Sequence, residues 1–239
     1  MRTLCVLSFL LMAALWSCAT HSTSPAPGKA TIEGRLRLVP REGVTPGHAQ
    51  RGPYGSLRYR DVTFVDYDHP GFAVVYLEGR PAPNGSARLA IRASTLGPRF
   101  EPSAAALGAS GALVLSNETG LAHAVSCPSM NLLRRLDPGA TEEITRPPVG
   151  SHPCFLLDAP ETKSILFVSP GPFAVVSDGG DWALRDVAPG PGRLVTWHPR
   201  FPPASRPIDV KPGGILRADF ELRVDAPETA ATGGNDDAP

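Results

Sequence analysis

Histidine and cysteine, the side chains that most often hold transition metals, lie close together in one part of this sequence. His123 comes four residues before Cys127, and His152 comes two residues before Cys154. Imidazole nitrogen and thiolate sulfur bind zinc and copper, whereas two cysteines can also form a disulfide. Three interpretations are open: a Cys127–Cys154 disulfide, a zinc or copper site built from all four residues, and two unpaired structural thiols.

The N-terminus bears on this choice, because it predicts the compartment. Residues 1–18 begin with Met-Arg, continue through an apolar stretch over 4–15 and end in Leu-Trp-Ser-Cys. This is an export signal, too short to anchor the chain as a membrane span. Its end resembles the lipobox of bacterial lipoproteins, which implies lipidation of Cys18. The alternative is a plain secretory signal cut near Ala19 or Thr20.

Export makes a disulfide permissible and leaves few cysteines to form it. The sequence has four cysteines, of which Cys5 and Cys18 belong to the signal. Only Cys127 and Cys154 remain in the exported chain, so one pairing is available. We take the disulfide as the leading interpretation. The even spacing of each histidine from its cysteine also allows the two side chains to share a face of a strand, so the metal site stays open.

Composition predicts an all-β protein. The 239 residues include 27 prolines and 24 glycines, with only 7% aromatic residues. Short apolar or alternating segments recur between turn residues, as in Ile32 to Val39 and Phe72 to Leu77, and this pattern favours β-sandwiches. Only 102–110 and 129–139 have a composition that tolerates helix. The 23 basic and 23 acidic residues balance, so nothing indicates nucleic-acid binding.

The motifs that usually identify enzymes are absent from the sequence. It contains no G-x-S-x-G, H-E-x-x-H or P-loop pattern, and no G-x-G-x-x-G that opens a helix. The Pro-Gly-Pro-Gly run at 189–192 is a turn, and the acidic pairs are scattered along predicted loops. We therefore predict that the protein is not an enzyme.

Two segments carry a family resemblance. "RFEPSAAALGASGALVLSNETGLAHAV" at 99–125 resembles the plastocyanin-like domain of methylamine-utilisation (cupredoxin-like) proteins, with an F-x-P motif, a strand, an N-x-T turn and a histidine. "PFAVVSDGGDWALRDVAPGPGRLVTWHP" at 172–199 resembles the carboxypeptidase regulatory-like module that follows that domain in such proteins. Its matching positions include Phe173, Asp178, Gly179, Pro189, Gly190, Trp197 and His198.

The resemblance implies the domain organisation. After the signal at 1–18 and a polar tether at 19–28, a cupredoxin-like β-sandwich with N-terminal strands is expected over 29–170. A small carboxypeptidase regulatory-like (prealbumin/starch-binding-like) β-sandwich is expected over 171–223. The tail at 224–239 is too poor in apolar residues to fold.

The same resemblance implies that the copper ligands are largely lost. His123 matches the first histidine of copper-bearing relatives, whose remaining ligands lie in one C-x-x-H-x-x-M loop. Counting back without gaps from the next strand puts Leu157, Pro160 and Lys163 at the cysteine, histidine and methionine positions. If Cys154 is made the thiolate, Leu157 and Pro160 take the other two positions. Neither register rebuilds a type 1 copper centre, and we expect no cofactor, with copper or zinc as the alternative.

The second module has no catalytic residues of its own. We expect Trp182 and Trp197 to be core or domain-interface aromatics, and His198 to be a structural residue hydrogen bonded at the end of a strand. The chain is thus predicted to be a bacterial lipoprotein of the outer membrane, facing the periplasm or the cell surface, with an unknown protein or glycan partner. Its predicted role is binding or scaffolding. The alternatives are a metal-handling or redox protein and a carbohydrate-binding module.

Overall fold

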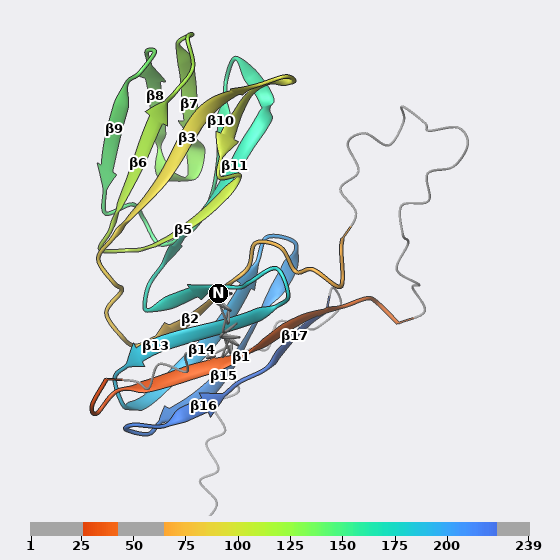
Figure 1. The fold of residues 1–239 in the computed structure, drawn as a ribbon, viewed down its shortest axis with the longest axis vertical. Helices are drawn as coiled ribbons and strands as arrows, with labels where there is room; N and C mark the ends of the chain where they lie inside the picture. Colours follow the sequence, from red (N-terminus) through yellow and green to blue (C-terminus); the bar gives the residue numbers. More distant parts are fainter. Residues whose placement is uncertain (1–25, 43–64, 224–239) are drawn as a thin grey trace, which may run out of the picture.

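The computed structural model describes residues 26–42 and 65–223, and these residues are built almost entirely from β-strands (Figure 1). One short 3-10 turn, η2 (Pro128–Met130), interrupts them. The predicted all-β class with stacked sheets is confirmed. The signal, most of the tether, the lipidation position Cys18 and the tail lie outside the described residues. No helix within the described ranges is long and apolar enough to cross a bilayer.

The middle of the chain forms one β-sandwich, consistent with a cupredoxin-like fold. One sheet has the strand order β4-β3-β6-β9, and the other has the order β5-β11-β10-β7-β8. The strands are β3 (Ser86–Ser94), β4 (Gly97–Glu101), β5 (Ala104–Gly108), β6 (Ala112–Asn117), β7 (His123–Cys127), β8 (Leu132–Leu136), β9 (Thr141–Thr145), β10 (Gly150–Leu156) and β11 (Ala159–Ser169).

Alternation along the strands explains why these two sheets stack. In β7, His123, Val125 and Cys127 point inward while the residues between them are partly exposed, which is the period of two expected of a strand with one buried face. The two inner faces meet in a shared apolar core that includes Leu89 and Leu166. Packing of such alternating faces is the main stabilising contribution to a sandwich.

A second sandwich contains the first two strands together with the C-terminal ones. Its sheets have the orders β12-β2-β14-β15 and β13-β1-β16, with β17 also paired to β1. The strands are β1 (Ala30–Val39), β2 (Val74–Glu78), β12 (Phe173–Val175), β13 (Asp181–Val187), β14 (Gly190–His198), β15 (Phe201–Val210), β16 (Ile215–Arg217) and β17 (Phe220–Arg223).

The expected domain boundary therefore needs a correction. The resemblance implies that the N-terminal strands belong to the middle domain over 29–170. In the structure, β1 pairs with β13, β16 and β17, and β2 pairs with β12 and β14. The middle sandwich is inserted between β2 and β12, which are themselves paired strands. Alternation in a strand shows that one face is buried, but it does not show which partner buries it.

An aromatic contact joins the two sandwiches. The ring of Phe167, on β11 of the middle sandwich, stacks on Trp197 of β14, with ring centroids 4.6 Å apart and planes inclined by 30°. The ring of Tyr76, on β2, also packs against Phe167, with ring centroids 5.7 Å apart. Where the chain returns from β11, a Cβ on Gly171 would lie 2.0 Å from the carbonyl oxygen of Leu77, so only glycine fits this crossing. These contacts fix which end of the middle sandwich faces the second one.

Candidate functional site

The loops at the other end of the middle sandwich position one of the predicted site residues, His123. The parallel register of β3 and β6 and the antiparallel register of β7 with β8 and β10 place four connections at this end: 95–96, 118–122, 137–140 and 157–158. We call it the distal end, because it lies opposite the second sandwich (Figure 1). His123 opens β7 here, and the 157–158 turn joins β10 to β11 beside it.

Cys127 and Cys154 form the predicted disulfide. Cys127 ends β7 and lies across from Cys154 of β10, since the register pairs Ser126 with Phe155. Their sulfurs are bonded at 2.02 Å, with Cα atoms 4.3 Å apart, and both residues are fully buried. The bond links neighbouring strands inside the apolar core of the middle sandwich.

In this structure His123, Cys127, His152 and Cys154 are not arranged as a metal site. Both sulfurs are bonded to each other, so neither is a thiolate ligand. His152 is occupied as well: its Nδ1 lies 2.8 Å from Ser129 Oγ, and its Nε2 donates to the carbonyl oxygen of Pro148 at 2.6 Å. Among the residues that the structure describes, no group of three or more histidine, cysteine, aspartate or glutamate side chains is placed to hold a metal ion.

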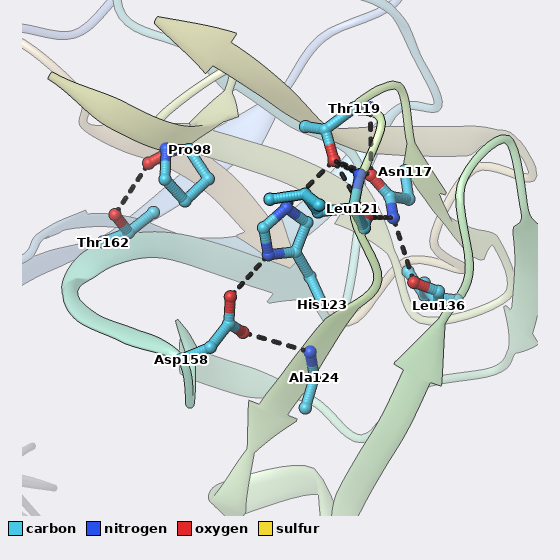
Figure 2. Close-up of polar contacts among 9 residues, drawn as sticks. All are labelled: Pro98, Asn117, Thr119, Leu121, His123, Ala124, Leu136, Asp158 and Thr162. Carbon is cyan, nitrogen blue, oxygen red and sulfur yellow. Dashed lines mark hydrogen bonds and ion pairs between the residues drawn. The ribbon is translucent and has the colours of Figure 1, made fainter. Parts of the chain in front are cut away.

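His123 is instead held by a carboxylate that the sequence analysis did not single out. Its Nδ1 donates to Asp158 Oδ2 at 2.6 Å, and its Nε2 lies 2.9 Å from Thr119 Oγ1 (Figure 2). The second oxygen of Asp158 accepts from the backbone N–H of Ala124 at 3.2 Å. His123 is only 4% exposed, so this hydrogen-bond set is how a buried imidazole is satisfied here.

A buried asparagine supports the other side of the same set. Asn117 Oδ1 accepts from the N–H of Thr119 at 3.0 Å and lies 2.8 Å from the hydroxyl oxygen of Thr119. Its Nδ2 donates to the carbonyl oxygens of Leu121 and Leu136, at 2.7 and 2.9 Å (Figure 2). The Asn-x-Thr turn noticed in the sequence is thus a side-chain-bonded turn that positions Thr119 against His123.

The environment of Asp158 favours its charged form. Burial acts to raise the pKa of its carboxyl, but hydrogen bonds from His123 and from the backbone N–H groups of Ala124 and of Asp158 itself outweigh burial and hold the pKa below its ordinary value. A carboxylate that accepts from the ring N–H of His123 also fixes which nitrogen of the ring faces Thr119.

The connection onto which the resemblance places the remaining copper-ligand positions is short in this chain. Only Leu157 and Asp158 separate β10 from β11. Pro160 and Lys163, the other positions of the ungapped register, lie within β11 and are exposed. The turn thus brings one side chain to His123, and that side chain is a carboxylate.

The remaining predicted residues lie in the second sandwich. Trp182 is buried, 6.3 Å from Phe220 between ring centroids, and Trp197 packs on Phe167 at the junction of the sandwiches. Trp182 is thus enclosed in the core, and Trp197 is partly buried, with Phe167 stacked on its ring. His198 ends β14, where its Nε2 donates to the carbonyl oxygen of Pro70 at 3.0 Å. Burial lowers the pKa of His198, which favours its neutral form.

Comparison with known proteins gives weak structural likenesses alone. No family model matches this chain, and no curated protein matches it. A purple cupredoxin from Nitrosopumilus maritimus is 15% identical with a TM-score of 0.31, over 35% of this chain and 99% of that protein. A mutant of amicyanin is 10% identical with a TM-score of 0.31, over 40% of this chain and 98% of its own. The copper nitrite reductase of Thermus scotoductus SA-01 is 15% identical with a TM-score of 0.31, over 36% of this chain and 22% of its own.

Removing the disulfide is expected to destabilise the protein strongly. The bond joins residues 27 apart in the sequence, and the chain-entropy model assigns a loop of this length about 3.5 kcal/mol. Urea unfolding of the Cys127→Ala/Cys154→Ala variant, produced without the signal, measures this loss. Ser126→Ala/Phe155→Leu, which changes the neighbouring strand pair but keeps the bond, is the control. A loss below about 1 kcal/mol in the double-cysteine variant would contradict the structural role assigned to the bond.

The Asp158 carboxylate is expected to make stability depend on acidity. Its pKa is lower in the folded chain than the usual value of about 3.9, so its contribution is present above about pH 4 and is lost as the pH falls through the folded value. We expect Asp158→Asn to unfold more easily at pH 7, by about 1 kcal/mol since the carboxylate is partly screened by solvent. The variant should also lose less further stability than the wild type below pH 4.

The control for this experiment is Asp137→Asn, which removes an exposed carboxylate at the same end of the sandwich. Urea midpoints measured across the acid range compare the three proteins. If Asp158→Asn and wild type keep the same difference in stability at every pH, the His123–Asp158 interaction does not contribute as described.

Proposed function

We propose that this chain is an exported, non-catalytic binding or scaffolding protein of the bacterial cell envelope. The observation that carries the proposal is the buried Cys127–Cys154 disulfide. Disulfides persist in oxidising compartments outside the cytoplasm, which agrees with the export signal expected over 1–18. The same bond ties the middle sandwich together as a rigid support.

The redox or metal-handling alternative receives less support from the geometry. A site for copper or zinc at this position would use cysteine sulfur as thiolate, and here the two sulfurs bond to each other. His123 directs Nδ1 to Asp158, and His152 has partners at both ring nitrogens. Each imidazole would have to give up hydrogen bonds before it could bind a metal.

A hydrolase built on Thr119, His123 and Asp158 is also less well supported, although the order of contacts resembles a nucleophile, base and orienting acid. The Thr119 hydroxyl lies 2.8 Å from Asn117 Oδ1 and accepts from the N–H of Leu121 at 3.3 Å. These contacts stabilise the turn to which Thr119 itself belongs. Two grooves of about 630 and 580 Å³ lie on the described surface, and neither is lined by Thr119, His123 or Asp158. An acyl-transfer site needs a cavity beside its nucleophile.

Intact mass spectrometry tests directly whether Cys127 and Cys154 form a disulfide or bind a metal ion. We expect the chain from Ala19 onward, purified from an oxidising compartment without chelator, to have a denatured mass lower by the two hydrogens of the disulfide. Its native mass should carry no zinc or copper adduct after incubation with either ion. Cys127→Ala/Cys154→Ala is the matched control, since it should lack the mass difference. Free thiols with one retained zinc or copper ion would overturn the binding-module proposal in favour of metal handling.

Cell fractionation tests the envelope location and the lipid anchor. We expect the full chain, expressed in a Gram-negative host, to enter the outer-membrane fraction, and Cys18→Ser to shift it to the soluble periplasmic fraction. The expected cause is loss of the only position for the diacylglycerol. Recovery of both forms in the soluble periplasm would favour the plain secretory signal instead. Recovery of the wild type in the cytoplasm with its cysteines reduced would overturn the proposal of export.

A further inference from the structure

Three leucines stand exposed on loops at the distal end of the middle sandwich. Leu96 is 97% exposed, Leu121 is 72% exposed and Leu157 is 56% exposed. Each belongs to a different connection: β3 to β4, β6 to β7, and β10 to β11. Single exposed leucines are ordinary on protein surfaces, but several at one end mark an interaction site.

Strand register places these connections at the same end of the molecule. Leu157 donates its backbone N–H to the carbonyl oxygen of Ala124 at 2.9 Å, so its turn lies directly beside the start of β7, near Leu121. The backbone N–H of Glu118 donates to the carbonyl oxygen of Ile91 at 2.8 Å. Strand β3 continues beyond Ile91 to Ser94, where its turn begins. Leu96 follows two residues later, in the turn between β3 and β4 at the same end.

The charges of this end are compensated within the protein. Glu118 forms ion pairs with Arg88 and Arg92, both at 2.8 Å. Asp137 lies 3.3 Å from Arg135, and Asp158 is bonded to His123. These are the acidic residues of the four distal connections. Beside Leu96, Arg99 pairs with Glu101 at 3.2 Å, and Glu161 and Lys163 line the same groove. Charges of both signs are therefore mixed here, and they form no cluster of basic residues.

We propose that the distal end binds the surface of a lipid bilayer, with Leu96, Leu121 and Leu157 inserted among the headgroups of neutral, zwitterionic lipids. Side chains that project from separate loop tips suit a soft, deformable surface, whereas protein interfaces need closely complementary, well-packed contact. Charge compensation agrees with a zwitterionic surface, because attraction to anionic lipid requires a cluster of unpaired lysine or arginine. This contact is additional to any lipid on Cys18, and it does not depend on the proposed function.

Co-sedimentation with vesicles tests the proposal. Residues 19–239, which retain every described strand, are mixed with phosphatidylcholine vesicles. We expect reversible binding with a partition constant on the order of 10⁴ M⁻¹, comparable to that of one acyl chain. Because insertion of leucine is not ionic, binding should change less than about twofold between about 0.05 and 0.5 M salt. Addition of anionic phosphatidylglycerol should change it equally little.

Substitutions locate the contact. We expect Leu96→Asp to weaken vesicle binding at least tenfold, and Leu157→Ser to weaken it more mildly. Ile215→Asp is the control, because Ile215 is 58% exposed but lies on β16 of the second sandwich; its binding should match the wild type. Circular dichroism verifies that each variant is folded.

Several results would overturn the proposal. They are no sedimentation of the wild type with phosphatidylcholine, binding that requires phosphatidylglycerol, and equal losses in Leu96→Asp and Ile215→Asp. Sedimentation velocity without lipid provides the last check: self-association that Leu96→Asp abolishes would assign this end to a second copy of the chain and not to a membrane.

Discussion

The antiparallel pairing of β7 with β10 is the constraint on which the middle sandwich depends. It places Cys127 opposite Cys154, so the disulfide forms across neighbouring strands inside the core. The same register brings the end of β10 to the start of β7, where Asp158 meets His123. One covalent and one electrostatic link thus hold the two ends of a single strand pair. A shift of one residue in either strand would turn that strand's cysteine out of the core.

The insertion of this sandwich between β2 and β12 has a mechanical consequence. Because β2 and β12 pair with each other, both connections to the middle sandwich leave from one edge of the second one. Phe167 then fills the space between them by packing on Trp197 and Tyr76. Two entry points and an aromatic contact restrict hinge motion more than a single linker does. The distal end is accordingly a fixed surface, opposite to the junction.

Local signals allowed the fold class and the disulfide to be predicted, while pairing between distant segments could not be. Strand alternation and the count of mature cysteines are properties of short stretches, and both predictions are confirmed. The membership of β1 in the second sandwich depends on its pairing with β13, about 150 residues away, and nothing in Ile32 to Val39 specifies that partner. For the same reason the helix-tolerant stretch Ala104–Gly108 became a strand: it pairs with β11. Asp158 carries no sequence signal, because an aspartate in a turn is ordinary.

The His123–Asp158 contact explains how the buried histidine of the distal end is satisfied. A buried imidazole needs partners at both nitrogens, and a metal ion is one way to satisfy one of them. Here Asp158 satisfies Nδ1, and Thr119, oriented by Asn117, satisfies Nε2. Since both partners come from loops, the interaction orders the 118–122 and 157–158 connections relative to each other. The imidazole thereby acts as a cross-link between two loops, and their exposed leucines are held on a rigid base.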